Sequence, residues 1–175
     1  MEKTSKNIVL VGPMGSGKTT VGRRLAHELN RDFFDTDHEI INKTGVTIDH
    51  IFDIEGEEGF RERESKILEN FCQMSNKILA TGGGIVILPK NRKILQNVGL
   101  VVYLTSSVDQ LLRRTAKSKS RPLLENSTDR RKTITEIVDT RDIYYREVAS
   151  VVIDTTGKNL HEVIKIIKRE AENVE

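Results

Sequence analysis

One segment near the start of the 175-residue sequence constrains the fold more than any other. A short apolar run, residues 8–11, is followed by the pattern G-x-x-x-x-G-K-[ST] at residues 12–19, and then by Val21, Leu25 and Leu29, which lie four apart. This order predicts a buried strand, a glycine-rich loop and an amphipathic helix in direct succession. Glycines let backbone N–H groups turn inward around an anion, and the helix directs its positive dipole end to the same point.

The loop is therefore expected to hold the phosphates of a nucleotide. Lys18 would reach the β- and γ-phosphates, and the Thr19 hydroxyl would ligate Mg²⁺. The alternative is a glycine-rich turn with a solvated Lys18, which the flanking strand and helix disfavour. The residues expected to contact the nucleotide here are Met14, Gly15, Ser16, Gly17, Lys18, Thr19 and Thr20.

Short apolar runs recur along the chain, each followed by Gly, Ser, Thr or Asp and then by helical periodicity; they are residues 8–11, 33–34, 78–80, 100–104 and 151–153. Continuous apolar runs are typical of strands buried on both faces, hence of a parallel sheet. Helices are expected from residue 17, around residues 60–72, after a cap at Ser107, around residues 134–145, and after a cap at Asn159. Alternating strands and helices predict a three-layer α/β fold with right-handed crossovers, and the length suits one domain, residues 1–175.

Charge and composition argue against several classes of protein. The 28 basic and 26 acidic residues give a net charge of +2, which disfavours a dedicated nucleic-acid binder. The one cysteine, Cys72, cannot form an intrachain disulfide and suits a reducing compartment. Because no apolar run is long enough for a signal peptide or a bilayer span, we expect a cytoplasmic protein with no membrane partner.

Two charged clusters are candidates for the acceptor side of a reaction. Asp35, Thr36 and Asp37 follow the second apolar run, where parallel sheets bind ligands. One carboxylate could hold Mg²⁺ and the other face an acceptor hydroxyl, although helix N-capping by Thr36 or Asp37 fits the pattern equally well. Arg61 and Glu64 lie three apart on a predicted helix, where Glu64 could orient Arg61 or form only an exposed ion pair.

A glycine triplet and a long basic segment complete the candidate site. Residues 82–84 are all glycine and follow Thr81 and the third apolar run, which favours close backbone approach to a ligand over a strained tight turn. The segment 115–129 is too long for an ordinary turn and is expected to be functional, a solvated surface loop being the alternative. Arg121 and Arg141 could supply positive charge to a phosphoryl group or a carboxylate, unless they are solvated surface residues.

Together these motifs resemble those of the shikimate kinases. The matching stretches, in family order and over nearly the whole chain, are GPMGSGKTT, FFDTDHEI, TGVTIDHIFDIEGEEGFRERE, ATGGGIV, RRTAKSKSRPLL and TRDIYYREVA. The resemblance implies a three-layer P-loop NTPase fold like that of the nucleoside monophosphate kinases, with a five-stranded parallel sheet flanked by helices and a lid at about residues 115–129. It also implies ATP-dependent phosphorylation of the 3-hydroxyl of shikimate, with Mg²⁺, in chorismate and aromatic amino acid biosynthesis.

By position, the resemblance gives each matching residue a role. Asp37 would contact the shikimate hydroxyls and act as the base, while Asp35 would support Mg²⁺ beside Thr19. Arg61 and Arg141 would hold the shikimate carboxylate. The other roles are Lys18 and Arg121 as catalytic residues on the phosphates, Gly82, Gly83 and Gly84 lining the pocket, a shikimate-binding region at about residues 35–64, Arg114 against the adenine, and Lys158 among the nucleotide contacts.

Two positions depart from the family pattern: Asn159-Leu160 stands where Asn-Pro is frequent, and Gly59 where many members carry a larger residue. The nearest alternative is a related small-molecule kinase, such as a gluconate kinase or a nucleoside monophosphate kinase. The others are a non-catalytic nucleotide-binding module and a nucleic-acid binder that uses Arg113, Arg114 and residues 117–121. We expect a monomer whose partners are shikimate and ATP, without nucleic acid.

Overall fold

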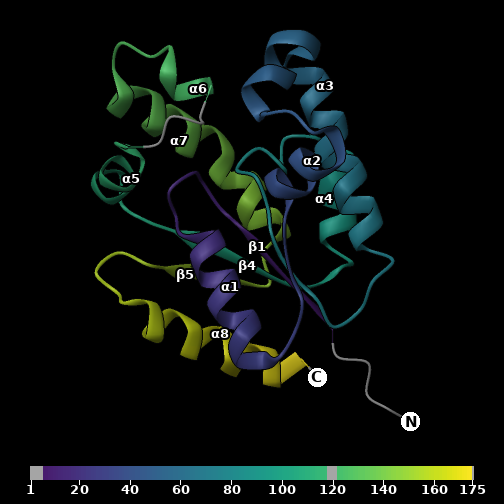
Figure 1. Ribbon diagram of the computed structural model, residues 1–175. Helices are drawn as coiled ribbons and strands as arrows, with labels where there is room; N and C mark the ends of the chain where they lie inside the picture. Colours follow the sequence, from purple (N-terminus) through teal and green to yellow (C-terminus); the bar gives the residue numbers. More distant parts are fainter. Residues whose placement is uncertain (1–5, 118–121, 175) are drawn as a thin grey trace.

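Five parallel strands form one sheet in the order β2-β3-β1-β4-β5 (Figure 1). The computed structural model describes residues 6–117 and 122–174, so Arg121, with its expected role on the phosphates, lies outside the described residues. The strands are β1 (Asn7–Val11), β2 (Phe33–Asp35), β3 (Ile78–Ala80), β4 (Gly99–Thr105) and β5 (Val151–Asp154). All five apolar runs are thus confirmed as strands, and their parallel arrangement is confirmed as well.

The side chains of the central strands form one apolar layer on each face of the sheet, because they point alternately to the two faces. Val9 of β1 lies opposite Leu79 of β3 and Val101 of β4. Because successive side chains of a strand point to opposite faces, Val9 packs on one face of the sheet and Ile8 on the other, in two separate clusters of buried residues. Each face must then be covered by helices.

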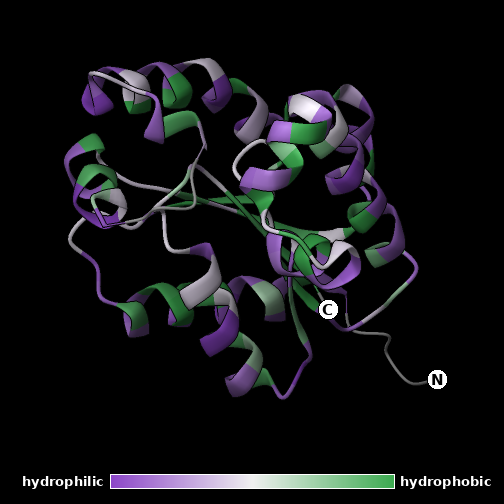
Figure 2. Cartoon of the chain, turned by 45° about the horizontal axis from the view of Figure 1, so that its top comes forward, coloured by the Kyte–Doolittle hydropathy of each residue, from purple (hydrophilic) through white to green (hydrophobic). Residues whose placement is uncertain are grey.

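Helices cover both faces, which gives the three predicted layers. On one face lie α1 (Lys18–Leu29) and α8 (Leu160–Val174), in contact with each other below the sheet in Figure 1. On the other lie the end of α3 (Ile48–Phe71), α4 (Pro89–Leu95) and α7 (Arg130–Val148). Figure 2 shows the hydrophobic strands between helices whose outer sides are largely hydrophilic. No helix in the described ranges is both long and apolar enough to cross a membrane.

Two smaller apolar clusters stand at the carboxyl ends of the strands. One joins α2 (Thr36–Thr44) to α3 through Ile40, Ile51 and Phe60. The other joins α5 (Val108–Thr115) and α6 (Pro122–Glu125) to α7 through Leu111 and Leu124. In Figure 1 these two groups of helices rise on opposite sides of the same sheet edge.

Several local predictions met different outcomes. The caps at Ser107 and Asn159 are confirmed, since each side chain accepts a hydrogen bond from a backbone N–H in the first turn of its helix. Burial on both faces holds for β1, β3 and β4 but is wrong for the edge strands: β2 is half-buried throughout, and Val152 of β5 is 41% exposed. We predicted neither α4, α6 nor the first half of α3, and α2 entered only through the capping alternative at Thr36 or Asp37.

The layer assignment predicts how two isoleucines differ in their effect on stability. Ile167 is fully buried between α8 and the sheet, so Ile167→Ala should lower the free energy of unfolding by roughly 2–5 kcal/mol. Ile143, on α7, is 68% exposed, and Ile143→Ala should change it by less than about 0.5 kcal/mol. Denaturant unfolding followed by circular dichroism measures both, and equal losses would contradict the layers described.

Candidate active site

All five strands end at one edge of the sheet, and two adjoining cavities lie there. The large cavity, of about 480 Å³, is lined mainly by residues 14–21 and by residues of the β5–α8 segment. The small cavity, of about 90 Å³, is lined mainly by residues of α3, by the glycines 82–84 and by Arg141. Met14, Asp37, Gly82 and Gly83 line both cavities, so the two share a wall.

The glycine-rich loop wraps around the Lys18 side chain. Lys18 is only 8% exposed, and its Nζ donates to the carbonyl oxygens of Gly12 at 2.7 Å and Pro13 at 2.9 Å. The solvated-lysine alternative is therefore wrong. Gly12 has a φ of 147°, and a Cβ there would stand 2.3 Å from the carbonyl oxygen of Leu104, so the loop cannot take this path with any other residue.

Asp35 joins the loop to the second strand. Its Oδ2 accepts a hydrogen bond of 2.6 Å from the Thr19 hydroxyl, and its Oδ1 accepts from the backbone N–H of Asp37 at 3.0 Å. Asp35 is thus the N-cap of α2, which corrects the alternative that named Thr36 or Asp37 as the cap. A hydroxyl and a carboxylate side by side at a phosphate loop are oxygen ligands that suit Mg²⁺, which keeps several waters and phosphate oxygens in its shell.

Two threonines hold the glycine triplet in position, Thr36, which we had considered only as a helix cap, and Thr81, for which we had predicted no role. The Thr36 hydroxyl accepts from the backbone N–H of Gly82 at 2.7 Å, and the Thr81 hydroxyl donates to the carbonyl of Leu10 at 2.9 Å. Both threonines are buried. Their positions directly after predicted strands were the signal available, since a buried hydroxyl at a strand end requires a hydrogen-bond partner.

The glycines 82–84 make room for side chains of α3. A Cβ on Gly84 would stand 2.1 Å from Nη1 of Arg61, and one on Gly82 would stand 2.4 Å from Oε1 of Glu64. None of the three glycines has a positive φ, so the strained-turn alternative is wrong. Bare backbone is needed here because charged side chains press against it.

Arg61 and Glu64 form a buried ion pair, with 2.8 Å between Nη1 and Oε2. Arg61 is 7% exposed and Glu64 is fully buried, which excludes the exposed-pair alternative. Burial raises the pKa of Glu64 to about 7, against the opposing effect of Arg61, and the charge of Asp37 adds to the rise. Arg141 lowers it, so two arginines and two carboxylates interact around one small cavity.

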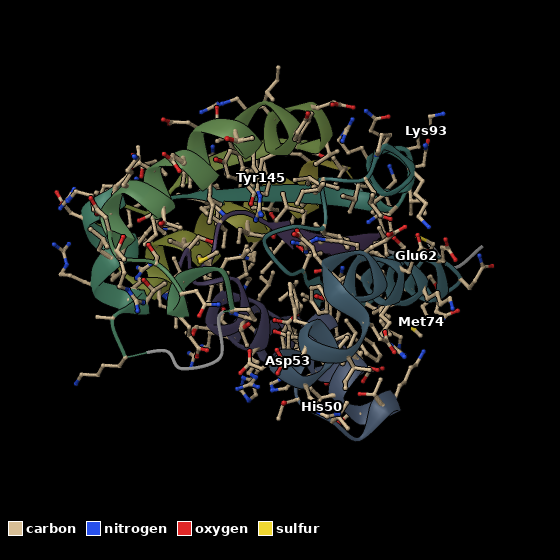
Figure 3. The ribbon with its side chains drawn as sticks, turned by 90° about the horizontal axis from the view of Figure 1, so that it is seen from above. His50, Asp53, Glu62, Met74, Lys93 and Tyr145 are labelled. Atoms are coloured by element: carbon tan, nitrogen blue, oxygen red, sulfur yellow. The ribbon has the colours of Figure 1, made fainter. Side chains whose placement is uncertain are left out.

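Arg141 lines the small cavity from α7, and Tyr145 lies one turn further along the same helix. Arg141 is 8% exposed and is therefore not a solvated surface arginine. Tyr145 is fully buried, and its hydroxyl donates to the carbonyl of Gly83. Burial raises the pKa of Tyr145 to about 12, with Arg141 opposing the shift, so the hydroxyl keeps its proton and remains a donor. In Figure 3 Tyr145 lies toward the middle of the molecule.

Arg114, at the end of α5, and Lys158, in the segment between β5 and α8, both line the large cavity. Nη1 of Arg114 donates to the carbonyl of Gly15 at 3.1 Å, which places its guanidinium on the phosphate loop. Nζ of Lys158 donates to the carbonyl of Asp154 at 2.8 Å, just after β5. Both residues thus line the cavity at which the sequence motifs placed the nucleotide.

Four apolar residues that line the small cavity had no individual role in the sequence analysis. Ile48 and Phe52 line it from the first half of α3, and Pro122 and Leu123 from α6. The spacing of Ile48, Ile51 and Phe52 is that of one helix face and could have indicated that half of α3. No comparable signal precedes α6, which is only one turn long.

A nucleotide-sized cavity over a phosphate loop that opens into a small, charged cavity is the arrangement of a P-loop kinase, in which donor and acceptor meet at one sheet edge. The family model for shikimate kinase matches residues 14–172. A shikimate kinase of Thioalkalivibrio sulfidiphilus is 49% identical over 97% of this chain and 88% of its own length. The chain belongs to the shikimate kinase family.

Solved structures agree with this assignment. The fold is similar to that of shikimate kinase from Acinetobacter baumannii in complex with shikimate, with a TM-score of 0.93 and 45% identity over 98% of this chain and 96% of that one. A gluconokinase from Sinorhizobium meliloti matches with a TM-score of 0.60 and 21% identity over 98% of this chain and 97% of that one, which is a likeness of fold alone. The P-loop fold and the family expected from the motifs are thereby confirmed.

The buried Glu64 predicts a specific pH dependence of stability. Its pKa is about 7 in the folded state against an ordinary value of 4.5, so its contribution is fully present below pH 4.5 and is lost as the pH rises to about 7. Relative to Glu64→Gln, the wild type should lose about 3 kcal/mol of unfolding free energy over that range. Urea unfolding across the range measures the difference, and the exposed Glu62→Gln is the control that keeps the wild-type slope. A flat difference curve would contradict the raised pKa.

Proposed function

We propose that this enzyme transfers the γ-phosphoryl group of ATP to the 3-hydroxyl of shikimate, giving shikimate 3-phosphate and ADP, in the biosynthesis of chorismate and aromatic amino acids. The observation that carries the proposal is the small cavity, in which two buried arginines and Asp37 adjoin the phosphate loop. Shikimate is a small carboxylate rich in hydroxyls, and arginines with a carboxylate match that chemistry.

On the donor side, ATP would lie in the large cavity with its phosphates on residues 14–20. Lys18 is already directed into the loop, and a bound phosphate would take over the interactions that its Nζ makes with the loop carbonyls. Arg114 and Lys158, at the borders of the cavity, would contact the rest of the nucleotide. The Thr19 hydroxyl and the Asp35 carboxylate would hold Mg²⁺, which neutralises phosphate charge when bound.

On the acceptor side, Arg61 and Arg141 would bind the shikimate carboxylate, and the glycines 82–84 would present backbone groups to the ring. Asp37, in the wall between the two cavities, would align the 3-hydroxyl and accept its proton as the phosphoryl group transfers. Because the transferring group is loose and highly charged, positioning and electrostatics account for most of the catalysis.

Several expectations stay predictions. Pro122 and Leu123 line the small cavity, which supports the assignment of a lid to residues 115–129. The role of Arg121 in that lid, the monomeric state, the cytoplasmic location and the lack of a nucleic-acid partner are tested by no observation on the described residues. The single-domain organisation over residues 1–175 has the same standing.

A coupled assay of ADP formation tests the proposed reaction. The protein with ATP and Mg²⁺ should form ADP in proportion to added shikimate. Gluconate and nucleoside monophosphates should give no more than the background rate, because gluconate carries its carboxylate and hydroxyls on an open chain rather than a ring, and a nucleoside monophosphate has no carboxylate. A higher rate with gluconate than with shikimate would overturn the proposal.

The proposed base predicts the kinetics of one variant. Asp37→Asn should lower kcat by at least about a hundredfold, because the amide cannot accept the proton. Asp53→Asn is the matched control, since Asp53 lies on the exposed side of α3, and it should keep wild-type kinetics. Steady-state kinetics with shikimate measure both. Wild-type turnover in Asp37→Asn, with circular dichroism unchanged, would exclude Asp37 as the base.

A further inference from the structure

The helix α3 is interrupted at Gly56, and each of its halves forms one wall of the small cavity. Gly56 has φ 69° and ψ −177°, a conformation that side chains other than hydrogen strongly disfavour. The first half contributes Ile48 and Phe52 to the cavity, and the second contributes Arg61 and Glu64. The angle between the halves therefore sets the distance between an apolar wall and a charged wall. In Figure 3, His50 and Asp53 mark the first half and Glu62 the second.

An ion pair spans the interruption on its outer side. Nε of Arg63 lies 2.8 Å from Oε2 of Glu55, and Nη2 lies 2.5 Å from Oε1, so the pair is bidentate. Glu55 precedes Gly56 and Arg63 follows it by seven positions, too far apart to be neighbours on a regular helix. Both side chains are partly exposed, at 37% and 38%. The bidentate contact between these two side chains restricts the angle between the halves.

Gly59 permits that angle. A Cβ on Gly59 would stand 2.5 Å from the Cβ of Glu55, whereas residues four apart on a regular helix have Cβ atoms about 5–6 Å apart. The atom in the way is fixed to the backbone rather than at the tip of a flexible side chain. Any side chain at position 59 would therefore push the first half of α3 away from the second.

Two contacts show that the same angle reaches the interior. The rings of Phe52 and Phe60, one from each half, have centroids 4.8 Å apart beside the small cavity. The Arg61 guanidinium in turn lies over the Phe60 ring, with its Cζ 5.4 Å from the ring centroid. A change at the outer surface would thus move Phe52 against Phe60 and alter the support of Arg61.

We propose that Glu55, Gly59 and Arg63, hereafter the helix brace, set the fit of the acceptor by fixing the angle between the halves of α3. This proposal rests on the proposed function, since the acceptor is taken to occupy the small cavity. The three residues line neither cavity, so they are positioning residues that act through Phe52, Phe60 and Arg61.

The kinetic test uses Gly59→Ala, Glu55→Gln and Arg63→Gln. Glu55→Gln and Arg63→Gln should each raise the KM for shikimate about two- to fivefold, the effect expected from losing one exposed ion pair, with kcat and the KM for ATP unchanged. Gly59→Ala should raise it at least as much, because it displaces Glu55. Gly59→Ala should also lower thermal stability, because its Cβ would stand 2.5 Å from that of Glu55, and the better helix propensity of Ala offsets only about 1 kcal/mol of that cost. The double variant Glu55→Gln/Arg63→Gln should show no more than the effect of either single one.

Glu62→Gln is the control, because Glu62 lies on the same helix in an exposed pair with Lys90 that does not span Gly56. Its KM for shikimate should stay at the wild-type value. An unchanged KM in both Gly59→Ala and Glu55→Gln would overturn the proposal, as would an equal rise in Glu62→Gln.

Amide hydrogen exchange without substrate separates this proposal from the proposed function. Residues 48–55 should exchange faster in Glu55→Gln than in the wild type or Glu62→Gln, because the first half of α3 is no longer braced. Equal exchange in all three proteins would overturn the brace. A wild type that phosphorylates no shikimate, yet shows the exchange difference, would overturn the function and the acceptor-fitting role while leaving the brace itself supported.

Discussion

Close backbone approach at the carboxyl edge of the sheet is the constraint on which the rest of the site depends. Gly12 passes within contact of the Leu104 carbonyl, and Gly82 and Gly84 lie against the carboxylate of Glu64 and the guanidinium of Arg61. A methyl group at any of these positions would meet a backbone or charged atom at less than a normal contact distance. The phosphate loop, the charged wall and the shared wall between the cavities all follow from this absence of side chains.

The charged side chains of the site lie in a region that the sheet and its helices enclose. Arg61, Glu64 and Arg141 are all nearly or fully buried, and an unpaired charge there would cost several kcal/mol. The Arg61–Glu64 pair offsets part of that cost, and Glu64 can take up a proton near neutral pH. The site is therefore held ready for an anionic ligand by groups whose charges already compensate one another.

Elements with a local sequence pattern could be predicted from the sequence. Features that depend on how distant segments pack together, such as burial and edge position, could not. The five strands and the phosphate loop were readable because each pattern lies within a dozen residues. The exposure of Val152 could not be predicted in this way. Whether a strand lies at the edge of a sheet depends on the strand order and not on the strand's own composition. Arg61 and Glu64 look the same in a sequence whether exposed or buried, and the choice among Asp35, Thr36 and Asp37 as helix cap turns on where β2 ends. The interruption at Gly56 was not readable either, because a single glycine within a helical pattern is often tolerated without a break.

The shared wall has a consequence for how the two ligands influence each other. Met14, Asp37, Gly82 and Gly83 belong to both cavities, so a ligand in either cavity meets the same four residues. Thermodynamic reciprocity then requires that whatever factor the nucleotide applies to the affinity of the acceptor, the acceptor applies to that of the nucleotide. A single molecule that spans both cavities would contact these residues from both sides, which makes the wall the natural point of linkage for a bisubstrate inhibitor.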